Sequence, residues 1–111
     1  MERDFTYVAD IVSGISALIH HPPTEASGDL HRIVNIGRSS PVNLLTFIET
    51  LEKYLGKVAT KKFLPIQPGD VPSTWADTSE LKKLTGYQPT TDLEEGIRKF
   101  VAWYKTYQGI T

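Results

Sequence analysis

The sequence of 111 residues contains no cysteine, which excludes a disulfide framework, a thiolate nucleophile and a cysteine-rich zinc site. An excess of charge is also missing, because 12 basic and 13 acidic residues leave a formal net charge of −1. A nucleic-acid-binding surface needs surplus Lys and Arg to displace counterions, so we expect no nucleic-acid partner. A small anionic ligand needs only one or two placed cations, and this charge balance permits it.

Long apolar runs and targeting segments are absent as well. No stretch approaches the roughly 20 apolar residues that a membrane-spanning helix requires. The N-terminal "MERDFTYV" lacks the basic-then-apolar layout of a signal peptide. We therefore predict a cytoplasmic protein with no membrane partner. The length and the 40% hydrophobic content indicate one globular domain spanning residues 1–111.

Glycine-rich phosphate loops are missing too, since neither G-x-G-x-x-G nor G-x-x-x-x-G-K-[ST] occurs. The three histidines are His20, His21 and His31. Adjacent residues on a helix point in different directions, so His20 and His21 are poor joint metal ligands. A helix C-terminus favours a positive imidazole, which explains this pair without a ligand. We predict neither a catalytic residue nor a metal site in the chain.

What the sequence does contain is a regular alternation of apolar patterns. The order β-α-β-α-β-α-α indicates a mixed α/β fold with few short strands and about four helices. The strands are expected at residues 3–8, 32–37 and 59–66. The helices are expected to start at Ala9 or Asp10, at Pro41 after an N-cap at Ser40, after Asp77 or Thr78, and after Asp92, with Gly56 and Gly86 as C-caps.

The apolar run "RIVNIG" (residues 32–37) is typical of a strand buried on both faces of a parallel sheet. Three short strands make a thin sheet, so this strand is expected to join strands that the chain does not supply. Such an unpartnered edge can pair with a second copy, and we predict a tendency to form a homodimer.

The loop "FLPIQPGDVPSTWADTS" (residues 63–79) is stiffened by three prolines, which have lost their φ freedom. Gly69 permits a turn or a close backbone approach, and Asp70 can accept hydrogen bonds from the two hydroxyls of a sugar diol. The alternative for Asp70 is a turn in which its carboxylate bonds its own backbone. Trp75 either stacks on a ligand or belongs to the core.

Two arginines are candidates for binding an anion. The guanidinium of Arg3 suits a diphosphate, and its alternative is a surface pair with Asp4 or Glu2. Arg38 lies in "NIGRSS", which is either an anion site ahead of a helix or simply a strand, a turn and a capped helix.

Three stretches taken together resemble a known family. They are "RDFTYVADIVSGI", "VNIGRSSPVNLLTFIETLEKYLGK" and "FLPIQPGDVPSTWADTSELKKLTGYQPTTDLEEGIRKFVAWY". In order and spacing they resemble the C-terminal third of nucleotide-sugar epimerases and dehydratases of the extended short-chain dehydrogenase/reductase family, most of all the UDP-glucuronate 4-epimerases. The resemblance implies a C-terminal substrate-binding segment that binds a UDP-sugar and places its "VNIG" strand at the edge of a Rossmann sheet.

The resemblance also implies roles for individual residues. Arg3 is similar to an arginine that contacts the diphosphate, and Asp70 to an aspartate that bonds the nucleotide ribose. Gln67 stands where some relatives carry an arginine that also holds the phosphates. In this family an N-terminal Rossmann domain binds NAD and a Tyr-x-x-x-Lys pair performs the chemistry. The sequence lacks the dinucleotide motif, and Tyr54 and Lys57 are only three residues apart, so the expectation is a truncated segment that cannot epimerise alone. The alternatives are a stand-alone binding or assembly module and part of a dehydratase.

Overall fold

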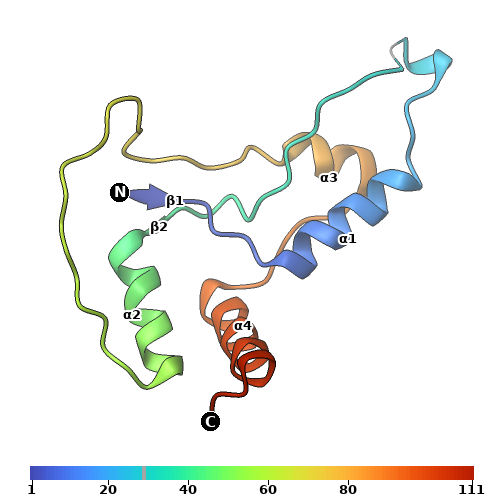
Figure 1. Cartoon of the computed structure of the whole chain (residues 1–111). Coiled ribbons are helices and arrows are strands. Elements are labelled where there is room, and N and C mark those ends of the chain that lie inside the picture. The colour runs from blue at the N-terminus through green and yellow to red at the C-terminus, as the bar shows by residue number, and fades with distance from the viewer. Residues whose placement is uncertain (29) are drawn as a thin grey trace.

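The computed structural model describes residues 1–28 and 30–111, and four α-helices carry most of the regular structure in that part (Figure 1). This number agrees with the sequence prediction. A short 3-10 turn, η1, covers Glu25–Ser27. The helices are α1 (Val8–Ile19), α2 (Leu44–Leu55), α3 (Ser79–Thr85) and α4 (Leu93–Gln108).

The helix ends follow local signals in the sequence. Gly56 and Gly86 end α2 and α3 with φ of 69° and 73°, a left-handed conformation that glycine adopts without a steric penalty. The predicted C-caps are therefore confirmed. The predicted start of α2 is wrong: Asn43 is the N-cap, and its side chain accepts a hydrogen bond from the Leu45 N–H at 2.9 Å. Ser40 does not cap the helix, because its backbone N–H donates to the Asp4 carboxylate.

Strands are far shorter than the apolar runs suggest. Among the described residues, β1 (Glu2–Arg3) and β2 (Val42–Asn43) form one antiparallel two-stranded sheet. The predicted strand at residues 3–8 is wrong beyond Arg3, and residues 32–37 and 59–66 are irregular. A strand needs a neighbour for its backbone N–H and C=O groups, and these segments find no ladder within the described chain.

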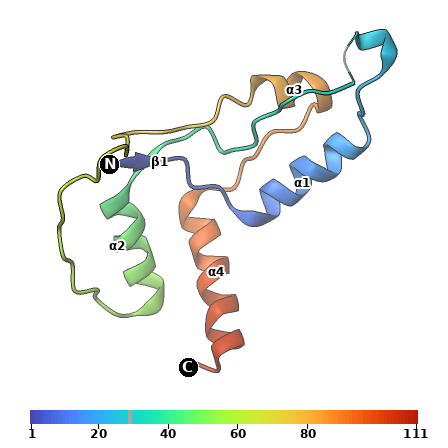
Figure 2. The ribbon, with the colours of Figure 1, turned by 45° about the horizontal axis from the view of Figure 1, so that its top comes forward.

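The helices form two pairs that lie apart. Figures 1 and 2 show α2 beside α4 and α1 beside α3, with the N-terminal segment running between the pairs. The molecule measures 55 × 36 × 19 Å, and its radius of gyration is 17.4 Å. A compact domain of this length has a radius of gyration of about 13 Å. The chain therefore forms a thin slab rather than two packed layers.

The core is correspondingly small. Its buried hydrophobic residues are Leu81, Ile97 and Val101. Trp75 is 63% exposed, so it is not part of the core. In the described part of the chain, no helix has both the length and the apolar character needed to cross a membrane.

Candidate functional site

Arg3 and Asp70 are 67 positions apart in sequence, and the structure brings them into contact. The Arg3 guanidinium donates to the Asp70 carboxylate over 2.9 Å, and the two side chains are 25% and 41% exposed. A second guanidinium nitrogen donates to the backbone carbonyl of Glu2 at 2.8 Å. The partner of Arg3 is thus neither the Asp4 nor the Glu2 carboxylate, the two alternatives that the sequence suggested.

The N-terminal strand holds Arg3 against the proline-rich loop. The Glu2 N–H donates to the Pro72 carbonyl at 2.8 Å, and the Thr74 N–H donates to the Glu2 carbonyl at 3.3 Å. These bonds form an isolated parallel bridge between Glu2 and Ser73. The strand and the loop are therefore joined backbone to backbone immediately beside the ion pair.

A tight turn presents the Asp70 carboxylate. The Asp70 N–H donates to the Gln67 carbonyl at 3.0 Å, and Gly69 has a φ of 88°. Pro68 followed by a glycine of positive φ is the pattern of a type II turn. The turn is closed by the backbone of Asp70, which leaves its carboxylate available to Arg3. Gln67 is exposed at the other end of the same turn. The turn therefore places Gln67 near Asp70, and the ion pair places Arg3 against Asp70.

Sequence reasoning missed the residue that organises this region. The Asp4 carboxylate accepts hydrogen bonds from the backbone N–H groups of Ser39 at 3.0 Å, Ser40 at 3.4 Å and Ala76 at 3.0 Å. We call Asp4, Gly37, Ser39, Ser40 and Ala76 the Asp4 knot. It joins three segments distant in sequence, and an aspartate directly after the candidate Arg3 is the only signal for it that the sequence carries.

Close packing accompanies these hydrogen bonds. A Cβ atom on Gly37 would lie 2.7 Å from both the Asp4 carboxylate and the Ala76 Cβ, so only glycine fits. Ser39 has a φ of 57°, which is uncommon for a residue other than glycine. Its hydroxyl donates to the Ala76 carbonyl at 2.5 Å. The knot thus fixes the backbone directly after Arg3, and the bonds of Glu2 to Pro72 and Thr74 fix it directly before Arg3.

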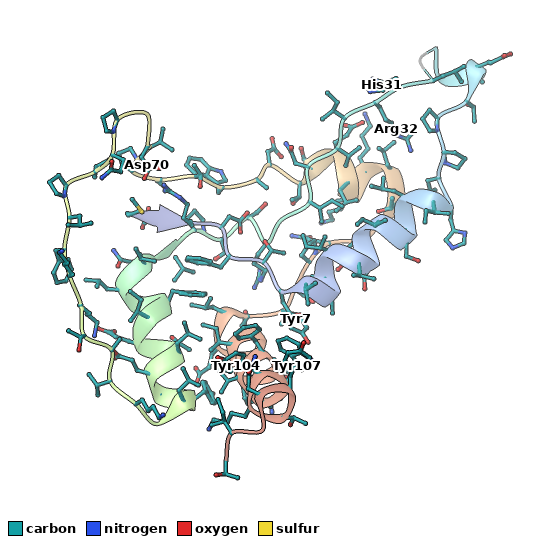
Figure 3. The ribbon with its side chains drawn as sticks, in the orientation of Figure 1. Tyr7, His31, Arg32, Asp70, Tyr104 and Tyr107 are labelled. Carbon is teal, nitrogen blue, oxygen red and sulfur yellow. The ribbon has the colours of Figure 1, made fainter. Side chains whose placement is uncertain are left out.

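A hollow of about 370 Å³ lies against the knot. Arg3, Asn35 and Trp75 contribute to its wall, one from each of the three segments. Asp70, which Figure 3 labels on the proline-rich loop, lies outside this wall. A guanidinium, an amide and an exposed indole around one hollow suit a ligand that combines negative charge with a planar ring.

Arg38, the other candidate for anion binding, has protein partners. Its guanidinium donates to the Asp92 carboxylate at 2.9 Å and to the Thr91 carbonyl at 3.3 Å. Since α2 begins at Leu44, Arg38 does not precede a helix N-terminus directly. The turn in "NIGRSS" therefore serves to anchor the start of α4.

The histidine pair lies at the end of α1. His21 Nδ1 lies 2.9 Å from the Ala17 carbonyl oxygen, a contact typical of a helix C-terminus. Among residues 1–28 and 30–111, no group of three His, Cys, Asp or Glu side chains could hold a metal ion.

Hydrogen bonds between α2 and α4 shift the pKa values of Glu94 and Tyr54. Hydrogen bonds from Lys53 and then from Tyr54 lower the pKa of Glu94, and the same bond to Glu94 raises the pKa of Tyr54. The Tyr54 hydroxyl donates to Glu94 at 2.9 Å. These contacts fasten α2 to α4 at the surface, so Tyr54 has a structural partner.

Comparison with known families gives one model that matches residues 1–100, and it is described as GDP-mannose 4,6 dehydratase. Among curated relatives, an uncharacterised protein of Methanocaldococcus jannaschii is 50% identical over 104 residues, which are 94% of this chain and 30% of that protein. A probable UDP-glucuronate 4-epimerase of Rhizobium meliloti is 44% identical over 94% of this chain and 34% of its own length.

Solved structures agree with these relatives. The UDP-glucuronic acid 4-epimerase of Bacillus cereus, in complex with UDP-glucuronic acid and NAD, superposes with a TM-score of 0.80 at 35% identity. The match covers 96% of this chain and 32% of that enzyme. It lies in the C-terminal region of such epimerases, as the sequence predicted. The chain thus spans about a third of the length of the relatives that it matches.

Proposed function

The chain belongs to the GDP-mannose 4,6 dehydratase family, and on that premise we propose that residues 1–111 form the UDP-sugar-binding portion of an NAD-dependent UDP-glucuronate 4-epimerase. Support for the substrate comes from the relatives: the Bacillus cereus enzyme was solved with UDP-glucuronic acid. Support for the location comes from this chain itself, in the pair formed by Arg3 and Asp70.

The ion pair between Arg3 and Asp70 is the observation that carries the proposal. An Arg guanidinium binds phosphate oxygens through two parallel hydrogen bonds, and a carboxylate accepts the two hydroxyls of a ribose. In the free chain the two groups satisfy each other. A partly exposed pair contributes only about 0–1 kcal/mol, so a diphosphate can replace Asp70 as the partner of Arg3 at little cost. Asp70 is then free to receive the ribose, with Gln67 beside it.

The residues present do not fit NAD by the Rossmann mode. The sequence has no G-x-G-x-x-G, and among the described residues the parallel pairing consists of the single Glu2–Ser73 bridge. A dinucleotide site needs a strand, a glycine-rich turn and a helix N-terminus in succession. We therefore assign NAD binding and hydride transfer to a part of the enzyme outside these 111 residues, and derive no step through NAD here.

Part of a nucleotide-sugar dehydratase is the second candidate, because the matching family model carries that description. Diphosphate and ribose contacts serve either reaction equally. We favour the epimerase because five curated relatives, at 41 to 44% identity, are named as UDP-glucuronate 4-epimerases or probable ones. The cytoplasmic location and a homodimer through residues 32–37 stay predictions.

A hybrid enzyme tests the proposal. It joins the part of the Bacillus cereus epimerase that this chain does not match to residues 1–111. We expect Arg3→Ala to weaken UDP-glucuronic acid binding by about tenfold to a hundredfold, the value of a charge-assisted hydrogen bond, as measured by calorimetry. Arg3→Lys keeps the charge but loses the planar fork, and should fall between Arg3→Ala and the parent.

Lys82→Ala removes an equal charge from α3 and serves as the matched control. Circular dichroism of each variant establishes that the fold is retained. Equal affinities for the parent and Arg3→Ala would contradict the assignment of the diphosphate to Arg3.

A further inference from the structure

A second hollow in the described part of the molecule is apolar, and neither Arg3 nor Asp70 lines it. It has a volume of about 720 Å³ and lies between α2 and α4 beneath residues 5–8. We call it the α2–α4 groove. Its apolar lining includes Phe5, Phe47, Leu51, Ile97, Phe100 and Trp103.

Aromatic rings are already ordered around this groove. Phe5 and Phe47 stack with their centroids 4.0 Å apart, and Phe100 and Trp103 lie 5.8 Å apart on successive turns of α4. Tyr7, in the segment before α1, lies against Gly96 in the first turns of α4, where an added Cβ would meet the tyrosine side chain at 3.3 Å. The aromatic side chains that line the groove thus contact one another in pairs.

The protein itself covers this lining poorly, so water reaches it. Phe100 is 50% exposed and Trp103 is 56% exposed, although both are among the most hydrophobic residues of α4. A contiguous exposed apolar patch with polar residues around it is the usual layout of an interaction surface. The lining also includes the charged residues Lys99 and Asp92, and apolar interfaces usually combine an apolar centre with polar residues.

The thinness of the molecule points to the kind of partner. A slab 19 Å thick, with Leu81, Ile97 and Val101 as its buried hydrophobic residues in the described part of the chain, lacks the second layer that normally covers amphipathic helices. The relatives supply further chain in the required amount, since this chain spans only 30 to 36% of their length. Their epimerase structures nevertheless match this slab with a TM-score of 0.80. The same backbone arrangement thus occurs within a protein three times as long.

We propose that the α2–α4 groove is the docking surface for the remaining two thirds of a full-length epimerase of this family. The apolar side chains of that partner fill the groove and turn the slab into a two-layer domain. Neither Arg3 nor Asp70 lines the groove, so docking there uses neither residue. The interface requires no nucleotide, so it does not depend on the proposed UDP-sugar role.

Thiol labelling tests this directly, because the chain has no cysteine of its own. Trp103→Cys and Leu51→Cys each place a unique thiol in the groove. Val58→Cys is the matched control, since Val58 is 85% exposed and does not line the groove. Each variant is prepared as the isolated chain and within the hybrid enzyme freed of other cysteines, and its reaction with a maleimide is timed without nucleotide.

We expect the groove thiols to react at least about tenfold more slowly in the hybrid than in the isolated chain, and Val58→Cys to react equally in both. Equal rates at the groove positions would overturn the proposal. A rate in the isolated chain that falls as chain concentration rises would also overturn it, in favour of a second copy as the occupant. Hydrogen exchange of the α4 amides in unsubstituted proteins repeats the comparison should a cysteine variant fail to fold.

Discussion

The Asp4 knot and the α2–α4 groove differ in how much of their structure the chain can complete by itself. In the knot, one carboxylate receives N–H groups from two other segments, and Gly37 packs against it without spare room. In the groove, aromatic rings are aligned but half exposed. Polar groups can be satisfied by a few local partners, whereas apolar burial needs a second layer. A thin slab can therefore order the polar residues around Arg3 while the apolar residues of the α2–α4 groove stay exposed.

Of the changes that contrast the two regions, loss of the Asp4 carboxylate should lower the free energy of unfolding most. Asp4→Ala leaves three N–H groups without their acceptor, and we expect it to lower the free energy of unfolding by about 3 kcal/mol. Urea unfolding followed by tryptophan fluorescence measures the loss. Asp92→Ala is the control, because Asp92 is exposed and its pair with Arg38 should contribute less than about 1 kcal/mol. Equal losses for the two variants would show that the knot does not organise the fold.

Adding one methyl group to each region gives the next contrast. Gly37→Ala places a Cβ 2.7 Å from two atoms of the knot, and we expect a cost of about 1–3 kcal/mol. Gly96→Ala lines the groove, where the new Cβ meets Tyr7 at 3.3 Å and alanine is the better helix former by roughly 1 kcal/mol. We therefore expect Gly96→Ala to be close to neutral in the same unfolding assay. A larger loss at Gly96 than at Gly37 would reverse the account of which region is tightly packed.

Acid titration should produce the smallest effect, at the surface of α4 beside the groove. Hydrogen bonds from Arg98 and then Lys99 lower the pKa of Glu95 from 4.5 to about 2. A lowered pKa means that the stabilisation is present above pH 4.5 and is lost as the pH falls towards 2. Carbon-detected NMR of the Glu95 carboxyl should show this low midpoint. Arg98→Ala should move it upwards, and Lys82→Ala should leave it unchanged. A midpoint near 4.5 in the parent would contradict the ion pair.

Helix ends were the part of the fold that the sequence predicted best, because they depend on local chemistry. Glycine can take a positive φ, so Gly56 and Gly86 end helices wherever an amphipathic pattern precedes them. Even here, tertiary contacts displaced one boundary. The Ser40 N–H bonds the Asp4 carboxylate, and the helix starts later with Asn43 as its cap.

The strands and the contacts of Arg3, Asp70 and the Asp4 knot depend on residues distant in sequence, which no local pattern reveals. The run at residues 32–37 has a strand composition, but its backbone finds no neighbouring strand in the described chain. The family resemblance correctly indicated the family and pointed to Arg3, Gln67 and Asp70 as site residues. Their roles stay proposals. The direct contact of Arg3 with Asp70, and the knot that holds Arg3, required the three-dimensional structure because the contacting segments lie 35 or more residues apart.

The side-chain NMR signals of Arg3 in the hybrid enzyme test the central claim most directly. Uridine offers a ribose without phosphates, and UDP adds the diphosphate. With uridine, the account predicts that the Asp70 signals shift and that the Arg3 guanidinium changes only because it loses Asp70 as its partner. With UDP, it predicts a further shift of the Arg3 guanidinium signals and slower exchange of the guanidinium protons, because the diphosphate then accepts their hydrogen bonds. Identical Arg3 spectra with uridine and with UDP would contradict it.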